Sequence, residues 1–147
     1  MFKIKVERIV KKPIDEVFEA ISDHASYGSF KAVGKAKLLT EGDDERNGAG
    51  ALRTIQTEPV KFWERITAFE RPTHMQYKIE KARPVKVRHD KGSIDLKDLG
   101  DGSTQVTWIS EGRLVLPLPL IGRLLDRKMQ KQGTVGFNSI LKAIESR

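Results

Sequence analysis

The sequence predicts an α+β domain in which one curved antiparallel sheet of about six or seven strands wraps around a long C-terminal helix. Three observations predict it: an amphipathic pattern from residue 117 onwards, alternating segments before it, and short turns between those segments. Strands joined by short turns form an antiparallel meander, and its apolar face needs a covering layer. The 147 residues suit one domain with one core, so we treat residues 1–147 as a single unit.

The C-terminal helix is the element around which the other segments are expected to pack. Apolar or small residues recur in it at spacings of three and four, the period of one helical face. They are Leu118, Ile121, Leu125, Met129, Gly136, Ile140 and Ile144. A helix over residues 118–146 would be on the order of 40 Å long, at about 1.5 Å per residue. Only a broad sheet can bury an apolar stripe of that length.

The chain begins with a predicted strand and a short helix. Residues 2–10 alternate apolar and polar side chains, which is typical of a half-buried strand. Pro13 suits the first turn of a helix, and Asp15 and Glu16 favour the positive end of its dipole. We expect this helix to end near Ser22, before a short helix or turn over residues 24–30.

Six further strands are predicted between the short helix and the long one. Each is a run of alternating or β-branched residues bounded by turn residues. Their ranges are 33–40, 50–57, 60–70, 75–80, 85–96 and 105–110. We expect a bulge near Lys91 and Gly92, and a tight hairpin turn at residues 100–103.

The chain carries a formal net charge of +7. Such a charge attracts nucleic acid, anionic lipid or acidic metabolites. The basic residues are dispersed, acids lie among them, and no nucleic-acid motif accompanies them, so we expect no nucleic-acid partner. We favour a protein with lysine-rich strand faces.

Composition also bears on the compartment. No apolar run reaches the roughly 18 residues that span a bilayer, and residues 1–5 lack the apolar block of a signal peptide. There is no cysteine, hence no disulfide framework and no thiolate nucleophile. We expect a cytoplasmic protein whose oligomeric state the sequence leaves open.

Short motifs recur along the chain in a specific joint order. They are residues 13–18 with 21–23, 27–30, 48–50 with Arg53, 64–67 with 71–72, 100–104 with 106–108, and the closing helix. By this order, which covers nearly the whole chain, the chain resembles the START-like (SRPBCC) superfamily, whose fold is called helix-grip, and within it the bacterial polyketide cyclase/dehydrase and lipid-transport-like group. Phe30 is a departure, because relatives often carry tryptophan there.

The resemblance implies a cavity between sheet and helix that binds hydrophobic or amphipathic small molecules such as lipids or polyketides, with no cofactor. It supports binding or transport more directly than any reaction. Alternation and helical spacing place the candidate ligand contacts on the inward faces. The candidates are Phe18, Phe30, Arg53, Ile55, Glu64, Ile66, Met75, Tyr77, Val87, His89, Trp108, Ser110, Met129, Gly133, Gly136 and Phe137.

Five of these candidates are polar side chains on a face that should be dry: Arg53, Glu64, Tyr77, His89 and Ser110. A buried charge without a partner is costly. If Arg53 and Glu64 both point inward, they pair with each other or meet water in a cavity. The alternative is that each lies at the solvated rim of the sheet.

An enzyme of the aromatase/cyclase or dehydratase kind is the alternative function. Its candidate catalytic residues are His89 and Tyr77, with Arg53 and Glu64 guiding an enolate or a water elimination. The histidines are not at metal-ligand spacing, so we expect no metal site. This hypothesis requires His89 or Tyr77 to line the cavity within hydrogen-bonding reach of a second polar group.

Two features of the helix region have two interpretations each. Gly133 and Gly136 lie on or beside the apolar stripe, where small residues leave room for a ligand or allow close helix–sheet packing. The apolar segment Leu114–Ile121, followed by basic residues, is either a portal that touches an anionic membrane or a packed helix entry. We favour packing for this segment, because loops that are this apolar are usually buried.

Overall fold

The computed structural model describes residues 1–147 and contains one seven-stranded antiparallel sheet with the order β1-β7-β6-β5-β4-β3-β2. The strands are β1 (Phe2–Val10), β2 (Lys35–Thr40), β3 (Leu52–Thr57), β4 (Val60–Glu70), β5 (His74–Arg83), β6 (Lys86–Asp98) and β7 (Thr104–Val115). From β3 to β7 every strand pairs with its predecessor in the chain, and β1 completes the sheet by pairing with β7.

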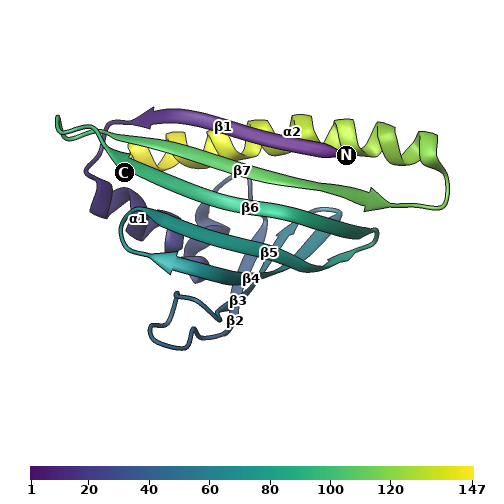
Figure 1. Cartoon of the computed structure of the whole chain (residues 1–147), viewed down its shortest axis with the longest axis horizontal. Helices are drawn as coiled ribbons and strands as arrows, with labels where there is room; N and C mark the ends of the chain where they lie inside the picture. The colour runs from purple at the N-terminus through teal and green to yellow at the C-terminus, as the bar shows by residue number, and fades with distance from the viewer.

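Three helical segments complete the fold: α1 (Ile14–Ser22), the 3-10 helix η1 (His24–Ser29) and α2 (Pro119–Glu145). Figure 1 shows α2 running the length of the molecule beside β1 and β7, with α1 at the end where α2 finishes. The predicted helix-grip fold is confirmed. The bulge predicted near Lys91 is present as a register shift between His89 and Lys91.

The edge strand β1 is covered by α2. Gln130 Oε1 of α2 accepts the Lys3 N–H at 2.9 Å, and Glu145 Oε2 accepts the Lys11 N–H at 2.7 Å. These two hydrogen bonds hold the helix at both ends of the strand. Side chains of α2 thus take part of the open edge of β1, near its two ends, in place of another strand.

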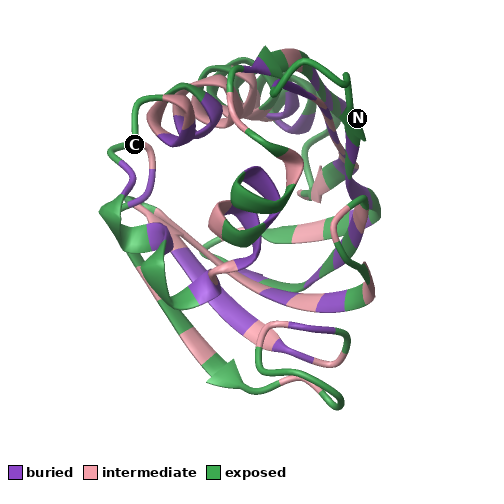
Figure 2. Ribbon diagram, turned by 90° about the vertical axis from the view of Figure 1, so that its left-hand side faces the viewer, coloured by how far each residue is buried: buried purple, intermediate pink, exposed green.

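The core lies at one end of the molecule, which we call the closed end: α1, η1 and residues 137–145 of α2 over the sheet. Figure 2 looks onto this end, where the short helical segments fill the space between the sheet and α2. Its fully buried side chains come from every layer and include Val10, Phe18, Ile21, Ile94, Leu141 and Ile144.

The opposite end, which we call the open end, consists of residues 115–135. Leu118 and Ile121, which the sequence pattern placed on the buried stripe, are 57% and 45% exposed. The helix instead buries Gly122 and Asp126 there, because Asp126 accepts the Leu114 N–H at 2.9 Å and turns that face toward β7. No helix of the structure combines the length and apolarity needed to cross a bilayer.

Candidate functional site

A charged cluster lies inside the sheet at the closed end. Arg53 on β3 donates from Nε and Nη2 to Glu64 Oε1 on β4, at 2.9 and 2.8 Å. Arg53 Nη1 also donates to His24 Nδ1 at 3.0 Å, and His24 Nε2 lies 2.8 Å from the Asn47 carbonyl oxygen. A guanidinium can only donate, so His24 is neutral with its proton on Nε2. Arg53 and Glu64 are thus buried as a pair, and the alternative of a solvated rim is wrong for both.

Burial sets the protonation states around this pair. Desolvation alone would lower the pKa of Arg53, but Glu64 beside it raises that pKa above its usual range. Burial, reinforced by the Arg53 charge, lowers the pKa of His24 to about 3. Burial raises the pKa of Tyr27 and of Tyr77, whose rings lie 4.7 and 5.5 Å from the Arg53 guanidinium carbon. At neutral pH the cluster is one ion pair surrounded by neutral polar groups.

A second polar cluster lies where β5 and β6 separate after three paired residues. His89 Nδ1 accepts the Ile79 N–H at 3.1 Å, and His89 Nε2 donates to Ser110 Oγ at 2.9 Å. The Tyr77 hydroxyl accepts from Trp108 Nε1 at 3.0 Å, and the Tyr77 ring stacks on His89 with centroids 5.6 Å apart. Burial lowers the pKa of His89, so its ring is neutral. The His89 side chain bridges the split between the two strands.

Tyr77 and His89 also line a pocket of about 260 Å³ between β5 and β6. The other lining residues are polar, charged or glycine, namely Thr67, Gln76, Lys78, Asp90, Lys91 and Gly92. His89 would have to release the Ile79 N–H before it could accept a proton, because that hydrogen bond occupies the Nδ1 lone pair. As it stands, the His89 ring can donate a hydrogen bond through Nε2 but cannot act as a base.

A groove of about 650 Å³ lies between α2 and the segment that follows η1. Its small and apolar lining is Ala32, Val135 and Gly136, and its polar lining is Lys31, Lys128, Lys131, Gln132 and Ser139. No acidic side chain lines it. The groove therefore combines apolar surface with three positive charges, which suits a molecule that has an apolar body and an anionic group.

The two helix glycines have different surroundings. A Cβ at Gly133 would lie 2.3 Å from Ile4 Cδ1 of β1, so Gly133 allows close helix–sheet packing. A Cβ at Gly136 would have Ala32 Cβ at 3.9 Å as its nearest neighbour, so Gly136 leaves space, and it lines the groove. The interpretation of close helix–sheet packing thus applies to Gly133, and the interpretation of space beside the helix applies to Gly136.

The predicted ligand contacts are dispersed over the structure. Gly136 is the one member of the set that lines the 650 Å³ groove, and Trp108 stacks on Phe137 with ring centroids 4.1 Å apart. The members buried in the sheet and helix core are Phe18, Phe30, Arg53, Ile55, Glu64, Ile66, Met75, Tyr77, His89, Trp108 and Ser110. Val87, Met129, Gly133, Gly136 and Phe137 are half-buried.

Sequence reasoning missed the lysines of the groove. The apolar stripe predicted for the long helix does not include Lys128 or Lys131, and Lys31 lies between the turn predicted over residues 24–30 and the strand predicted from residue 33. The available signal was that Lys128, Lys131 and Val135 share one helical face by their spacings of three and four. The spacing of the histidines gives no sign of the role of His24, which accepts a hydrogen bond from Arg53 in the structure. No three His, Cys, Asp or Glu side chains group closely enough to bind a metal ion.

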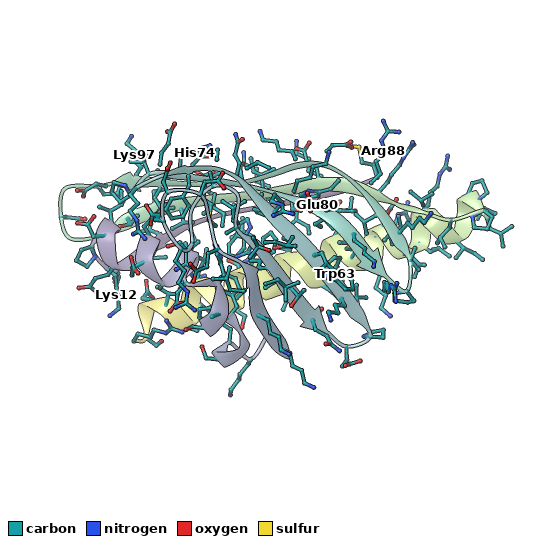
Figure 3. All side chains as sticks on the ribbon, turned by 90° about the horizontal axis from the view of Figure 1, so that it is seen from below. Lys12, Trp63, His74, Glu80, Arg88 and Lys97 are labelled. Carbon is teal, nitrogen blue, oxygen red and sulfur yellow. The ribbon has the colours of Figure 1, made fainter.

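The favoured interpretation of the apolar segment Leu114–Ile121 is wrong. Leu114 and Leu116 are half-buried, but Leu118, Leu120 and Ile121 are 57%, 74% and 45% exposed. The segment leaves β7 after Val115 and then continues beyond the ends of the strands (Figure 3). Packing therefore does not account for the apolar side chains of residues 118–121.

Comparisons with known proteins agree on the fold. A sequence model described as "Polyketide cyclase / dehydrase and lipid transport" matches residues 1–139, whereas a comparison with curated proteins finds no match. A START superfamily protein from Mycobacterium smegmatis is 15% identical, with a TM-score of 0.75 over 100% of this chain and 97% of its own. The Zhui aromatase/cyclase from a Streptomyces species is 16% identical, with a TM-score of 0.76 over 99% and 94%. At these identities the likeness concerns the fold alone.

Proposed function

Because this chain belongs to the polyketide cyclase/dehydrase and lipid transport family, we propose that it binds a hydrophobic or amphipathic small molecule against α2. The family supports ligand binding or a cyclase role in general terms, and the choice between them depends on the site. The observation that carries the proposal is the 650 Å³ groove beside α2, whose volume suits a small molecule.

The charges of the groove narrow the class of ligand. Lys31, Lys128 and Lys131 line it, and none of them forms an ion pair within the protein. Unpaired ammonium groups beside apolar surface favour a carboxylate or phosphate joined to a hydrocarbon or aromatic body. The proposed ligand is therefore an anionic amphiphile.

The first experiment is native mass spectrometry of the gently purified protein, followed by organic extraction of the bound material. The expected result is a stoichiometric anionic amphiphile. Titration with 11-(dansylamino)undecanoic acid and with its methyl ester then tests the charge, because the two probes differ only in the carboxylate. The acid should bind about tenfold more tightly than the ester.

Two variants connect this binding to the groove. Gly136→Leu fills the space above Ala32 and should abolish binding of the acid, and Lys128→Gln/Lys131→Gln should remove its advantage over the ester. Lys5→Gln/Lys97→Gln is the matched control, since both lysines are exposed on strands away from the groove. Equal affinities for acid and ester in the native protein, or unchanged binding in Gly136→Leu, would contradict the proposal.

The second candidate is a cyclase- or dehydratase-type activity. It is favoured by one observation: Tyr77 and His89 line the 260 Å³ pocket, and His89 lies 2.9 Å from Ser110 Oγ. It requires His89 to act through Nε2 as a hydrogen-bond donor. Chromatography of products from a poly-β-ketone thioester mimic tests it, with His89→Gln expected to lose turnover. Equal product with and without the protein would rule this candidate out.

A further inference from the structure

The open end carries a cluster of exposed apolar side chains that neither the core nor the groove explains. We call it the apolar tip, and it consists of Val115, Leu118, Leu120, Ile121 and Leu124, which are 45% to 74% exposed. These five residues lie within ten positions of the chain and account for half of the ten large apolar side chains exposed on the protein. Exposed apolar side chains gathered in one part of a protein are typical of an interaction site.

The charges around the apolar tip have a single sign. Between residues 112 and 131 the exposed charged side chains are all basic: Arg113, Arg123, Arg127, Lys128 and Lys131. None of them forms an ion pair. The one acid of this stretch, Asp126, is 4% exposed and is neutralised by its contact with the N-terminal ammonium of Met1 at 2.7 Å. The open end therefore presents positive charge beside apolar surface.

From this arrangement we infer that the apolar tip docks onto a membrane surface that carries anionic phospholipid. Leucine and isoleucine side chains enter the interface between head groups and acyl chains, while the arginines and lysines contact lipid phosphates. The projection of the start of α2 beyond the strands, visible in Figures 1 and 3, lets it reach a flat surface without the sheet interfering.

A second copy of this chain is the competing occupant, and the charges oppose it. An isologous contact between two apolar tips would bring five unpaired basic side chains from each chain together, with no exposed acid to compensate them. Like charges at close range are unfavourable, whereas an anionic membrane neutralises all of them at once. Charge complementarity therefore favours the lipid surface.

The apolar tip also adjoins the ligand groove. Leu120, Leu124, Lys128 and Val135 follow one another at spacings of four, four and seven, which places them on one face of α2. The first two belong to the apolar tip, and the last two line the groove. A docked protein would thus hold the groove at the lipid surface, although docking itself does not depend on any ligand.

The test is co-sedimentation with vesicles of phosphatidylcholine alone or mixed equally with phosphatidylglycerol, at low and at high ionic strength. We expect association with the anionic vesicles that weakens with salt, because screening reduces the attraction. Leu120→Ser/Leu124→Ser should lower the partition coefficient at least about tenfold. Ile9→Ser/Leu39→Ser is the matched control, because those side chains are 56% and 50% exposed on strands. This variant should leave the partition coefficient unchanged.

The charge contribution has its own pair of variants. Arg123→Glu/Arg127→Glu should abolish the preference for anionic vesicles, while Lys5→Glu/Lys97→Glu lowers the net charge equally and should preserve it. Titration of the dansyl acid without vesicles distinguishes a failure of docking from a failure of ligand binding. No association of the native protein at low salt would overturn the inference. So would a concentration-dependent dimer that Leu120→Ser/Leu124→Ser dissociates.

Discussion

Both ends of α2 carry leucine and isoleucine side chains, but these side chains are buried at one end and mostly exposed at the other. At the closed end, Ile140, Leu141 and Ile144 are at most 4% exposed and pack into the core. At the open end, Leu120 and Leu124 are 74% and 64% exposed, and the buried positions are taken by Gly122 and Asp126. Burial at one end supplies stability, whereas the leucines at the other end do not contribute to the core. This difference is the basis on which we propose a membrane contact for the open end.

The largest expected effect is at the charged cluster of the closed end. Arg53→Met removes the partner of Glu64 and leaves a buried carboxylate uncompensated, which should lower the free energy of unfolding by about 3–5 kcal/mol. Urea denaturation followed by circular dichroism measures it. The control is Arg53→Met/Glu64→Met, which removes both charges and should recover most of the loss. A single variant as stable as the native protein would show that the pair is solvated.

The next effect compares equivalent leucines at the two ends. Leu141→Ala empties a fully buried site and should lower the free energy of unfolding by about 3 kcal/mol. Leu124→Ala, at a position 64% exposed, should change it by less than about 0.5 kcal/mol. Both values come from the same denaturation assay. Similar losses for the two variants would remove the distinction between the ends.

Acid should weaken the closed end through its buried histidines. His24, whose ordinary pKa of 6.5 falls to about 3, and His89, whose pKa is also lowered, stay neutral in the folded protein. The unfolded chain binds those protons below about pH 6.5, so stability present above that pH is lost as the pH falls. For each such proton, the free energy of unfolding should fall by about 1.4 kcal/mol per pH unit.

The matched variant for this titration is His24→Gln. Glutamine can still accept from Arg53 and donate to the Asn47 carbonyl, but it does not titrate. Between pH 7 and about pH 4, the free energy of unfolding should therefore fall less steeply in the variant than in the native protein. The difference in slope should correspond to roughly one proton. An unchanged slope would mean that His24 is already protonated in the folded protein.

The smallest effect separates the two glycines at the boundary between the ends. Gly136→Ala should raise the free energy of unfolding by about 0.5–1 kcal/mol, since its Cβ meets only Ala32 at an ordinary distance. Gly133→Ala should lower stability, because its Cβ would overlap Ile4, which is 2% exposed and confined. Thermal unfolding of both variants provides the comparison. Equal stabilisation would mean that β1 and α2 can move apart without cost.

The fold was predictable because local patterns and the global architecture agree. Alternation located β1 and β4 with their observed bounds, and the glycines of the hairpin turn, Gly100 and Gly102, have the positive φ values that such turns require. The strands that were misjudged in length, such as β7, continue into residues whose alternation is broken by Gly112. Local signals locate elements better than they locate their ends.

The candidate site was less predictable, because it depends on which side of α2 meets the sheet. The apolar stripe predicted for α2 is only partly buried at the open end, where Leu118 and Ile121 are exposed while Leu125 and Met129 are half-buried. Asp126 turns its own face of the helix toward β7 by accepting the Leu114 N–H, a contact between elements that no single-sequence pattern contains. The same orientation of α2 determines that Lys128 and Lys131 line the groove. Burial of Arg53 with Glu64 was predictable as one of two alternatives, because alternation brings both to the inward face.

The two hydrogen bonds from α2 to the backbone of β1 also protect the molecule from self-association. Lys3 within the nine-residue strand β1, and Lys11 directly after it, would otherwise present free N–H groups at the border of the sheet. The other border, β2, is shorter at six residues and carries Lys35 and Lys37, a length and charge that discourage pairing with another chain. Aggregation on heating should therefore begin when α2 detaches, and it should proceed by strand addition at β1.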